Sequence, residues 1–216
     1  MAVAERLDGA FVKLWIREAS HDMHAQRDFL TQLDAAIGDA DHGVNMDRGF
    51  AAVLAELEGS DGSPGELLGA VGSTLVLGVG GAAGPLYGSA IRNMGRELGD
   101  AETFDAEGLL VALRAGLGEI ERLGAAVPGD KTIVDAFQPA LLAFERGLRA
   151  GGGLNGAAVR AAVAAEEGML ATVPMQARKG RASYLGPRSI GHQDPGATST
   201  TILFAALERA AVEGAS

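Results

Sequence analysis

Apolar residues recur every three or four positions along most of this chain, with polar residues between them. Near the N-terminus, Leu7, Phe11 and Trp15 follow this spacing. A period close to that of a helix places such residues on one face, so each stretch predicts a helix with one buried side. The same spacing returns within residues 50–57, 86–98, 109–123, 133–148 and 154–170. The pattern therefore predicts an all-α fold of about eight or nine helices.

Glycine-rich segments separate the predicted helices. Residues 59–65 and 151–153 have the composition of plain connectors. Residues 173–196 form a longer stretch without periodicity, and an irregular run of that length inside a compact domain is normally either functional or disordered. Because this run contains several specific polar residues, we expect it to contribute to a functional site.

Composition narrows the class of protein. Ala and Leu dominate the 47% of apolar residues, which favours helices, and 216 residues are enough for one domain spanning residues 1–216. The formal charge of -10 argues against nucleic acid or an anionic membrane surface as the main partner. The sequence has no cysteine, so any metal ion would need oxygen or imidazole ligands.

Charged residues interrupt the N-terminal segment Met1–Ile16, where Glu5, Arg6, Asp8 and Lys13 lie among apolar residues. A signal peptide needs an uninterrupted apolar core, so we expect none here. No apolar stretch has the length needed to cross a bilayer, since glycines break even residues 67–79. We expect a soluble, cytoplasmic protein.

Three carboxylates lie close together between residues 34 and 41. Asp34 falls in the last turn of a predicted helix, and Asp39 and Asp41 lie in the loop after it, where Gly38 can end the helix in a left-handed conformation. In an extended loop, Asp39 and Asp41 project to the same side. Such carboxylates repel one another unless a cation lies between them, and oxygen ligands suit Mg²⁺.

The charge of this cluster indicates how many ions it needs. Three ionised aspartates carry -3, so one Mg²⁺ leaves -1 and repels a nucleotide, whereas two leave +1 and attract it. We therefore expect a site with two Mg²⁺ ions. The alternative is that Asp39 and Asp41 are solvated turn or capping residues. An EF-hand is excluded, because Gly43 and Val44 stand where its loop needs a ligand and a glycine.

The glycine-rich segment 78–88 is a second candidate site, since it runs into a predicted helix with Pro85 at its start. Free backbone N–H groups at a helix N-terminus bind phosphate. The segment lacks the Gly-Lys-Ser/Thr of a Walker A loop. Gly78, Gly80 and Ala83 do fit the G-x-G-x-x-A of a dinucleotide-binding Rossmann turn, provided that residues 74–77 form a strand. Close helix packing by small residues is a third interpretation.

Polar residues in other loops are open to two interpretations. Arg181 could hold a diphosphate through its planar guanidinium, or it could be a surface arginine. His192 could contact a nucleotide or pack its own loop. We interpret Lys131 as part of a helix start capped by Asp130 rather than as a catalytic group. Tyr184, like Trp15, is predicted to be a core residue.

Five segments together resemble the dihydroxyacetone kinase L-subunit family. They are residues 38–46, 80–88, 129–132, 180–186 and 191–199, which span nearly the whole chain in order. The resemblance implies an antiparallel eight-helix barrel, or bundle, with the nucleotide site in loops at one end. It also implies a bound ADP or ATP held through two Mg²⁺ ions.

The resemblance also assigns roles to residues. It implies that Asp34, Asp39 and Asp41 are metal ligands and, with Arg181, the catalytic residues. Phosphate contacts are implied for His42, Gly43, Val44, Asn45, Ala83 and Gly84. Contacts with the base and ribose are implied for Gly124, Ile133, Arg181, Asp194, Pro195 and Gly196. The family usually has Gly where this chain has Ala40, which would be strained if the position needs a positive φ, and often Ser where it has Ala83.

The resemblance further implies a partner, because the chain holds no second domain for a substrate. Dihydroxyacetone would be bound by a separate K subunit, and in members linked to the sugar phosphotransferase system a phosphohistidine-carrying subunit rephosphorylates the bound ADP. In ATP-dependent relatives the nucleotide exchanges freely. Two other function classes stay open: a non-catalytic nucleotide sensor that regulates a partner protein, and a Rossmann-type oxidoreductase.

Overall fold

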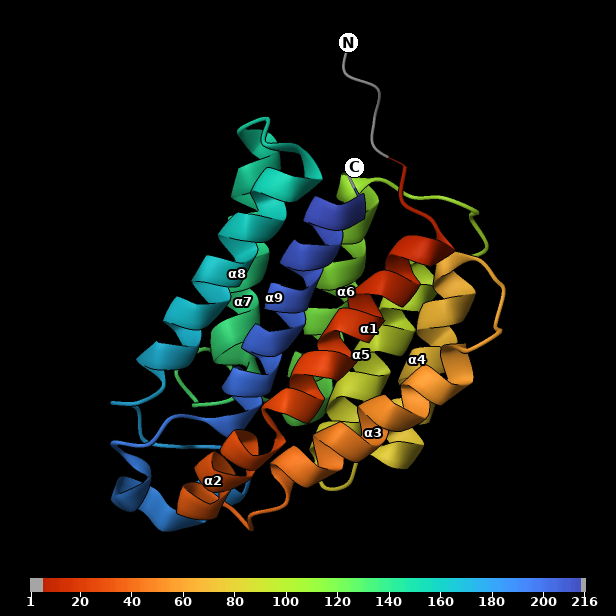
Figure 1. Ribbon diagram of the computed structural model, residues 1–216. Coiled ribbons are helices and arrows are strands. Elements are labelled where there is room, and N and C mark those ends of the chain that lie inside the picture. Colours follow the sequence, from red (N-terminus) through yellow and green to blue (C-terminus); the bar gives the residue numbers. More distant parts are fainter. Residues whose placement is uncertain (1–5, 215–216) are drawn as a thin grey trace.

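The computed structural model describes residues 6–214, which form nine α-helices and one 3-10 helix (Figure 1). Residues 1–5, including Glu5 of the N-terminal segment, and residues 215–216 lie outside the described range. No strand occurs among the described residues, so the all-α prediction is confirmed. The elements are α1 (Gly9–Ala25), α2 (Arg27–Ile37), α3 (His42–Leu57), α4 (Pro64–Gly78), α5 (Ala83–Leu98), α6 (Ala106–Gly124), α7 (Ile133–Arg149), α8 (Gly153–Ala171), η1 (Arg181–Ser189) and α9 (Pro195–Gly214).

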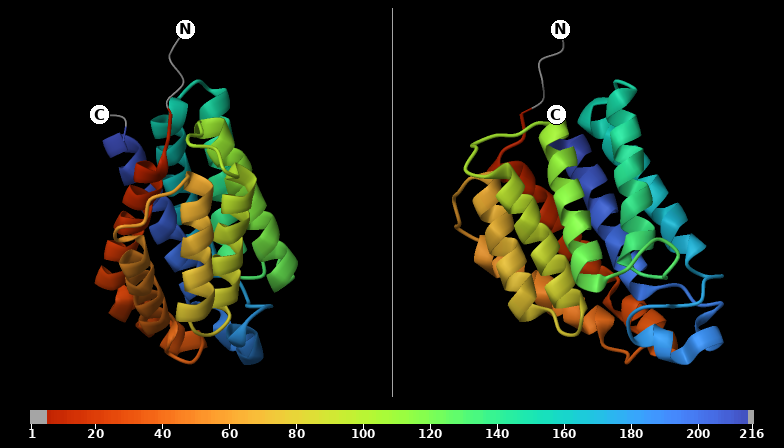
Figure 2. Two further views of the ribbon diagram at one scale, coloured as in Figure 1. Left: turned by 90° about the vertical axis from the view of Figure 1, so that its right-hand side faces the viewer. Right: turned by 180° about the vertical axis from the view of Figure 1, so that it is seen from behind.

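Eight of these α-helices form a closed ring. Helix α1 contacts α3, the helices from α3 to α9 contact one another in chain order, and α9 returns to α1. Successive helices of the ring run in opposite directions (Figures 1 and 2). Helix α2 lies across one end of the ring and contacts α3 and α9. Because the direction alternates, α3, α5, α7 and α9 all begin at the end where α2 lies.

Apolar side chains from all eight ring helices form one buried cluster, as the spacing predicted for α1, α3, α5, α6, α7 and α8. Polar contacts close the ring between its first and last helices. The indole Nε1 of Trp15 donates a hydrogen bond to the carbonyl of Leu203 at 2.9 Å, and the Arg209 guanidinium pairs with Glu18 at 2.8 Å. A buried indole needs such an acceptor, so Trp15 both fills the core and fixes α1 against α9.

The contact between α4 and α5 depends on glycine. A Cβ on Gly72 would lie 2.4 Å from the carbonyl oxygen of Gly88, and one on Gly95 would lie 2.6 Å from that of Gly65. No side chain fits at these distances, so the two backbones pack directly against each other. For Gly88, the interpretation as close helix packing is therefore confirmed.

The segment predicted as one irregular run, residues 173–196, is more ordered than expected. It contains the 3-10 helix η1, and α9 already begins at Pro195. Tight 3-10 turns have no strong apolar period, and Gly186 interrupts η1 with φ 55°, so the pattern of apolar residues did not reveal this element. The segment lies beside α2 at one end of the barrel (Figure 2).

Candidate functional site

A cavity of about 300 Å³ opens at the end of the barrel where α3, α5, α7 and α9 begin. Four helix N-termini therefore face one space, and each brings the positive end of a helix dipole. The start of α5 also has no side-chain cap for its backbone N–H groups. Eleven of the predicted site residues line this cavity: Asp34, Asp39, Asp41, His42, Ala83, Gly124, Ile133, Arg181, Asp194, Pro195 and Gly196.

The three aspartates lie together as predicted. Each offers a carboxylate oxygen, and these oxygens all lie within 4.8 Å of one another. Asp34 is buried, and its Oδ2 accepts hydrogen bonds from the backbone N–H groups of Asp41 at 2.9 Å and His42 at 3.1 Å. Asp34 thus joins the end of α2 to the start of α3. Clustered carboxylate oxygens without sulfur or imidazole are the ligand set of a hard divalent ion, so the residues present fit Mg²⁺.

The turn that carries the aspartates differs in one detail from the prediction. Gly38 ends α2 with φ -141°, so it does not adopt the left-handed conformation. Glycine is needed there for another reason: a Cβ would lie 1.9 Å from Asp34 Oδ1. The left-handed residue of this turn is Ala40, with φ 63°, so that position does need a positive φ. The conformation costs alanine more than glycine.

The glycine loop between α4 and α5 lies over Asn45. A Cβ on Gly80 would lie 2.8 Å from Asn45 Oδ1, and Arg48 donates a hydrogen bond to that same oxygen at 2.8 Å. The chain can therefore pass close to α3 only with a bare backbone at Gly80. Helix α5 begins at Ala83, so Pro85 is its third residue rather than its first. A proline is tolerated there because the N–H groups of the first turn have no partner within the helix.

Four of the predicted nucleotide-binding residues do not line the cavity: Gly43, Val44, Asn45 and Gly84. Gly43 packs against α2, where a Cβ would lie 2.0 Å from the carbonyl oxygen of Arg27. Val44 is exposed, and Gly84 is buried against Val79. For these four residues, contact with a nucleotide stays a prediction.

The Rossmann interpretation is wrong. Residues 74–77 lie inside α4, and the structure contains no strand between residues 6 and 214. The segment Gly78–Ala83 therefore follows a helix, whereas a dinucleotide-binding turn needs a strand before it. The short apolar run resembled a strand because a few consecutive apolar residues fit a buried helix equally well.

A chain of hydrogen bonds lies beneath the aspartates. His42 Nε2 lies 3.0 Å from Ser199 Oγ, and that oxygen lies 2.7 Å from the hydroxyl of the buried Tyr87. The Tyr87 hydroxyl also lies 2.7 Å from Thr200 Oγ1 and joins α5 to α9. Burial raises the pKa of Tyr87 and lowers that of His42, although Asp34 and Asp41 partly oppose the shift at His42. The network therefore holds His42 at the floor of the cavity.

The 3-10 helix η1 brings a cation to the aspartates. Arg181, its first residue, places Nε 3.0 Å from Asp39 Oδ2. The side chain of Arg181 is 67% exposed, so it is free to turn toward a ligand. Tyr184 on the same element is 87% exposed, which contradicts its prediction as a core residue. In a 3-10 helix an apolar or aromatic residue need not continue a buried stripe, so helical spacing misled the assignment.

The start of α7 is capped by a different residue from the one predicted. Thr132 is the N-cap, and it forms a capping box with Asp135, whose Oδ2 accepts a hydrogen bond from the Thr132 N–H at 2.7 Å. Asp130 instead accepts from the Val127 N–H at 3.0 Å. Lys131, set aside as part of a simple helix start, is buried and lines the cavity. No pattern of apolar residues marks such a lysine.

Part of the cavity lining is apolar, and only some of these residues were predicted from the sequence. Ile133 was predicted, and Leu86, Ile120 and Ala126 line the same cavity. All four were available in the sequence, but Leu86 and Ile120 continue the apolar stripes of their helices and so look like core residues. At the open end of a barrel the same stripe no longer faces another helix, and it can cover the flat face of a base.

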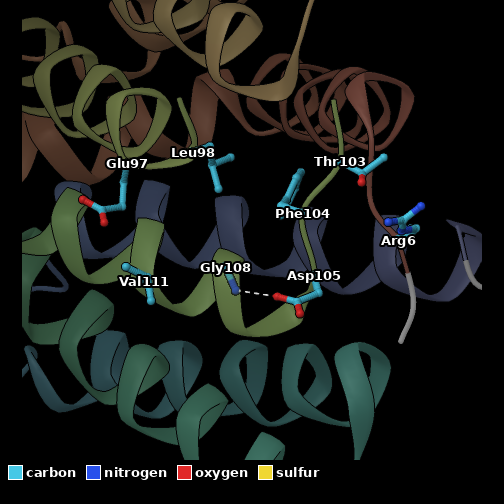
Figure 3. A pocket seen from close by; sticks show the side chains of 8 residues that line it. All are labelled: Arg6, Glu97, Leu98, Thr103, Phe104, Asp105, Gly108 and Val111. Carbon is cyan, nitrogen blue, oxygen red and sulfur yellow. Dashed lines mark hydrogen bonds between the residues drawn. The ribbon is translucent and has the colours of Figure 1, made fainter. Parts of the chain in front are cut away.

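A larger open cavity of about 560 Å³ lies at the opposite end of the barrel, around the start of α6 (Figure 3). Its lining includes Arg6, Glu97 and Asp105, but Asp105 is already used as the helix cap and accepts from the Gly108 N–H at 2.8 Å. The larger volume of this cavity therefore does not mark it as the functional site. The smaller cavity holds the carboxylate cluster and four helix N-termini.

The chain is thus an all-α barrel protein with a carboxylate cluster and four helix N-termini in one cavity, and comparison with known proteins assigns it to a family. The chain belongs to the DAK2 domain family, which it matches over residues 36–209.

Two similar proteins align with nearly the full length of this chain. The ADP-binding subunit DhaL of PEP-dependent dihydroxyacetone kinase 1 from Listeria innocua is 41% identical over 196 residues, which is 89% of this chain and 92% of that protein. The corresponding subunit from Escherichia coli is 40% identical and covers 92% of this chain and 95% of its own length.

A solved structure supports the fold. The dihydroxyacetone kinase of C. freundii in complex with AMP-PNP and Mg²⁺ superimposes with a TM-score of 0.70 at 24% identity. The match covers 96% of this chain but only 35% of that longer one. None of the described helices of the present chain is long and apolar enough to cross a membrane.

Proposed function

We propose that this chain is the nucleotide-binding, phosphoryl-transferring subunit of a dihydroxyacetone kinase. The observation that carries the proposal is the group formed by Asp34, Asp39 and Asp41 inside a cavity that four helix N-termini face. Relatives of similar length, about 40% identical, are named as ADP-binding subunits of such kinases. Both point to a nucleotide whose phosphates lie between the aspartates and the helix N-termini.

The residues of the chain suit phosphoryl transfer, which requires positioning and charge rather than a covalent intermediate. Asp34, Asp39 and Asp41 would hold two Mg²⁺ ions, which would neutralise the phosphate charge and leave the site attractive to an anion. The backbone N–H groups around Ala83 would orient the phosphates, and Arg181 would turn from Asp39 to the transferred group. The apolar lining at Ile133 would cover the base.

The substrate would come from another subunit. The relatives of this length are named as single subunits of their kinases. We propose a separate dihydroxyacetone-binding K subunit as the partner. Because those relatives are named PEP-dependent, we also propose that bound ADP is rephosphorylated on this chain by a phosphohistidine-carrying subunit of the phosphotransferase system.

Titration calorimetry of ADP and ATP, with and without Mg²⁺, tests the site. We expect binding that requires Mg²⁺ and is lost in Asp39→Ala and in Asp41→Ala, of which only Asp39 contacts Arg181. Asp61→Ala is the matched control, because that carboxylate is fully exposed and pairs only with Lys13 in the described structure. Metal-independent binding, or binding that survives both cluster substitutions, would contradict the proposal.

A phosphoryl-transfer assay separates the kinase from a nucleotide sensor. With Mg²⁺, the chain alone should leave dihydroxyacetone unchanged, and addition of a K subunit should yield its phosphate with either ATP or the phosphohistidine-carrying subunit as the donor. Mg²⁺-dependent nucleotide binding without transfer from either donor in the presence of K subunits would favour the sensor. Titration with Mn²⁺ at saturating ADP tests the proposed count of two ions per chain.

A further inference from the structure

Lys131 is a buried lysine that the proposed chemistry does not use. Its side chain is 1% exposed, although it stands in a loop between α6 and α7. Its backbone adopts φ 63°, a conformation that an L-residue seldom takes without a reason in the surrounding structure. The local turn is fixed separately by Asp135, which accepts hydrogen bonds from the N–H groups of Gly129 and Thr132. The turn is therefore built so that the lysine points inward.

The ammonium group of Lys131 meets three backbone carbonyls. Its Nζ donates to the carbonyl oxygens of Met175 at 3.2 Å, Ser189 at 2.6 Å and His192 at 2.5 Å. An ammonium group has three N–H donors, so these three acceptors use all of them. None is left for a phosphate oxygen. Lys131 lines the cavity, but its hydrogen bonds are directed into the protein.

All three acceptors belong to one segment, residues 173–192, which we call the cavity loop. Its two ends meet where the Gly191 N–H donates to the Val173 carbonyl at 2.8 Å, and its near side is held where the Arg178 N–H donates to the Asp130 carbonyl at 3.0 Å. The loop carries Lys179, Gly180 and Arg181 to the cavity. Lys131 therefore binds both the beginning and the end of the segment that presents Arg181.

Burial opposes a charged Lys131, but its three carbonyl acceptors support one. Burial lowers the pKa of Lys131, and the neighbouring Asp194 raises it. A buried cation persists only where acceptors replace its water, and three carbonyl oxygens do so here. If the ammonium were removed, these carbonyls would lose a shared donor in a place from which water is largely excluded.

We propose that Lys131 is a positioning residue that holds the cavity loop in place, and so sets Arg181 against the carboxylate cluster. The part of this inference that concerns Arg181 rests on the proposed function, whereas the part that concerns the loop does not. Lys131 acts through Arg181 and does not itself touch the nucleotide.

Hydrogen exchange of the full chain without nucleotide tests the loop directly. In Lys131→Met, the amides of Ala177, Arg178 and Gly191 should exchange at least about tenfold faster than in the wild type, while amides in the middle of α7 keep their rates. Lys13→Met is the matched control, since it removes the same charge from an ion pair between α1 and the loop before α4. Unchanged exchange in the cavity loop of Lys131→Met would overturn the proposal.

If the Lys131→Met variant does not fold, the same experiment is done with the Lys131→Arg variant. It keeps the charge, but a planar guanidinium cannot direct its donors to the same three carbonyls. We expect the same local increase in exchange, of smaller size. Wild-type exchange rates in the cavity loop of Lys131→Arg would overturn the proposal in that case.

Coupling to Arg181 is measured through the Kd of ADP with Mg²⁺ in the single and double variants. If Lys131 acts through Arg181, the fold-change caused by Arg181→Gln should be clearly smaller in the Lys131→Met background than in the wild type. Equal fold-changes in both backgrounds would overturn the link to Arg181. Absence of nucleotide binding in the wild type would contradict the proposed function, while the exchange experiment would still decide the role of Lys131 in the loop.

Discussion

Among single residues, Asp194 is notable because burial disfavours the ionised form of its carboxyl group. Its carboxylate is buried at the start of α9 and accepts a hydrogen bond from the Ala197 N–H at 2.7 Å. Burial raises the pKa of Asp194 to about 7, with a further contribution from Asp135, and the hydrogen bond and Lys131 only partly oppose the shift. The protonated form is thus favoured in the folded protein only below about pH 7.

The raised pKa of Asp194 makes the free energy of unfolding decrease as the pH rises. The pKa of Asp194 is higher in the folded chain than in the unfolded one, so its contribution is fully present below about pH 4 and is lost as pH rises to about 7. Asp194→Asn keeps the cap acceptor but cannot ionise. Relative to the wild type, this variant should gain up to about 4 kcal/mol of unfolding free energy between pH 4 and 8. Urea unfolding at both pH values measures it, and a constant difference between the two proteins would contradict the assigned shift.

Some features of the site could be predicted from the local sequence, and others could not. The aspartates were predicted as a cluster from their spacing alone, and their oxygens do lie together. The burial of Lys131 depends on contacts with residues distant in the chain. Neither propensity nor periodicity contains that information, so a single sequence could not supply it.

At the level of elements, the packing of α4 on α5 depends on which glycines face the partner. Gly72 lies against the Gly88 carbonyl, whereas an added Cβ on Gly69, one turn earlier in the same helix, meets no atom within 4 Å. Glycine weakens a helix at both positions equally. Only at Gly72 does the close approach of α5 compensate for that weakness.

The two positions predict substitutions of opposite sign. Gly72→Ala should lower the unfolding free energy by about 1–3 kcal/mol, because the new methyl group forces α4 and α5 apart. Gly69→Ala should raise it by about 0.5–1 kcal/mol through helix propensity alone. Chemical unfolding followed by circular dichroism measures both. Equal effects at the two positions would show that the helices do not pack as closely as described.

Helices themselves were the easiest elements to predict, since each buries one stripe of apolar residues in the common cluster. Errors fell at their ends and in η1. Thr132 rather than Asp130 caps α7, because the capping box needs Asp135 three residues later, and η1 has no apolar stripe that could reveal it. Capping chemistry and short 3-10 turns are decided by hydrogen bonds that periodicity does not describe.

Considered as a whole, the molecule brings groups of opposite electrostatic effect together at one end. Four helix N-termini and one cluster of aspartates share a cavity there. The helix dipoles attract the phosphates of a nucleotide, and the aspartates repel them. A divalent cation between the aspartates and the phosphates removes this repulsion. Nucleotide and metal should therefore stabilise the fold only when both are bound.

Thermal unfolding tests this linkage. With ADP and Mg²⁺ both present at about 100 times the Kd, we expect stabilisation of about 2.7 kcal/mol, or a rise in Tm of about 5–10 °C. ADP with EDTA, or Mg²⁺ without ADP, should give a small fraction of that rise. Differential scanning calorimetry of the wild type and Asp39→Ala provides the comparison. A full rise with ADP in EDTA would contradict a metal-dependent site.

The sequence by itself determined the helical class, the approximate positions of the helices and the cluster of three aspartates, because these follow from local spacing and side-chain chemistry. Only the tertiary structure decided that α3, α5, α7 and α9 begin at one end, that the loop after α8 returns over that end, and that Lys131 holds it there. The physical reason is that these features depend on the closure of the ring of alternating helices. Closure brings together residues far apart in sequence.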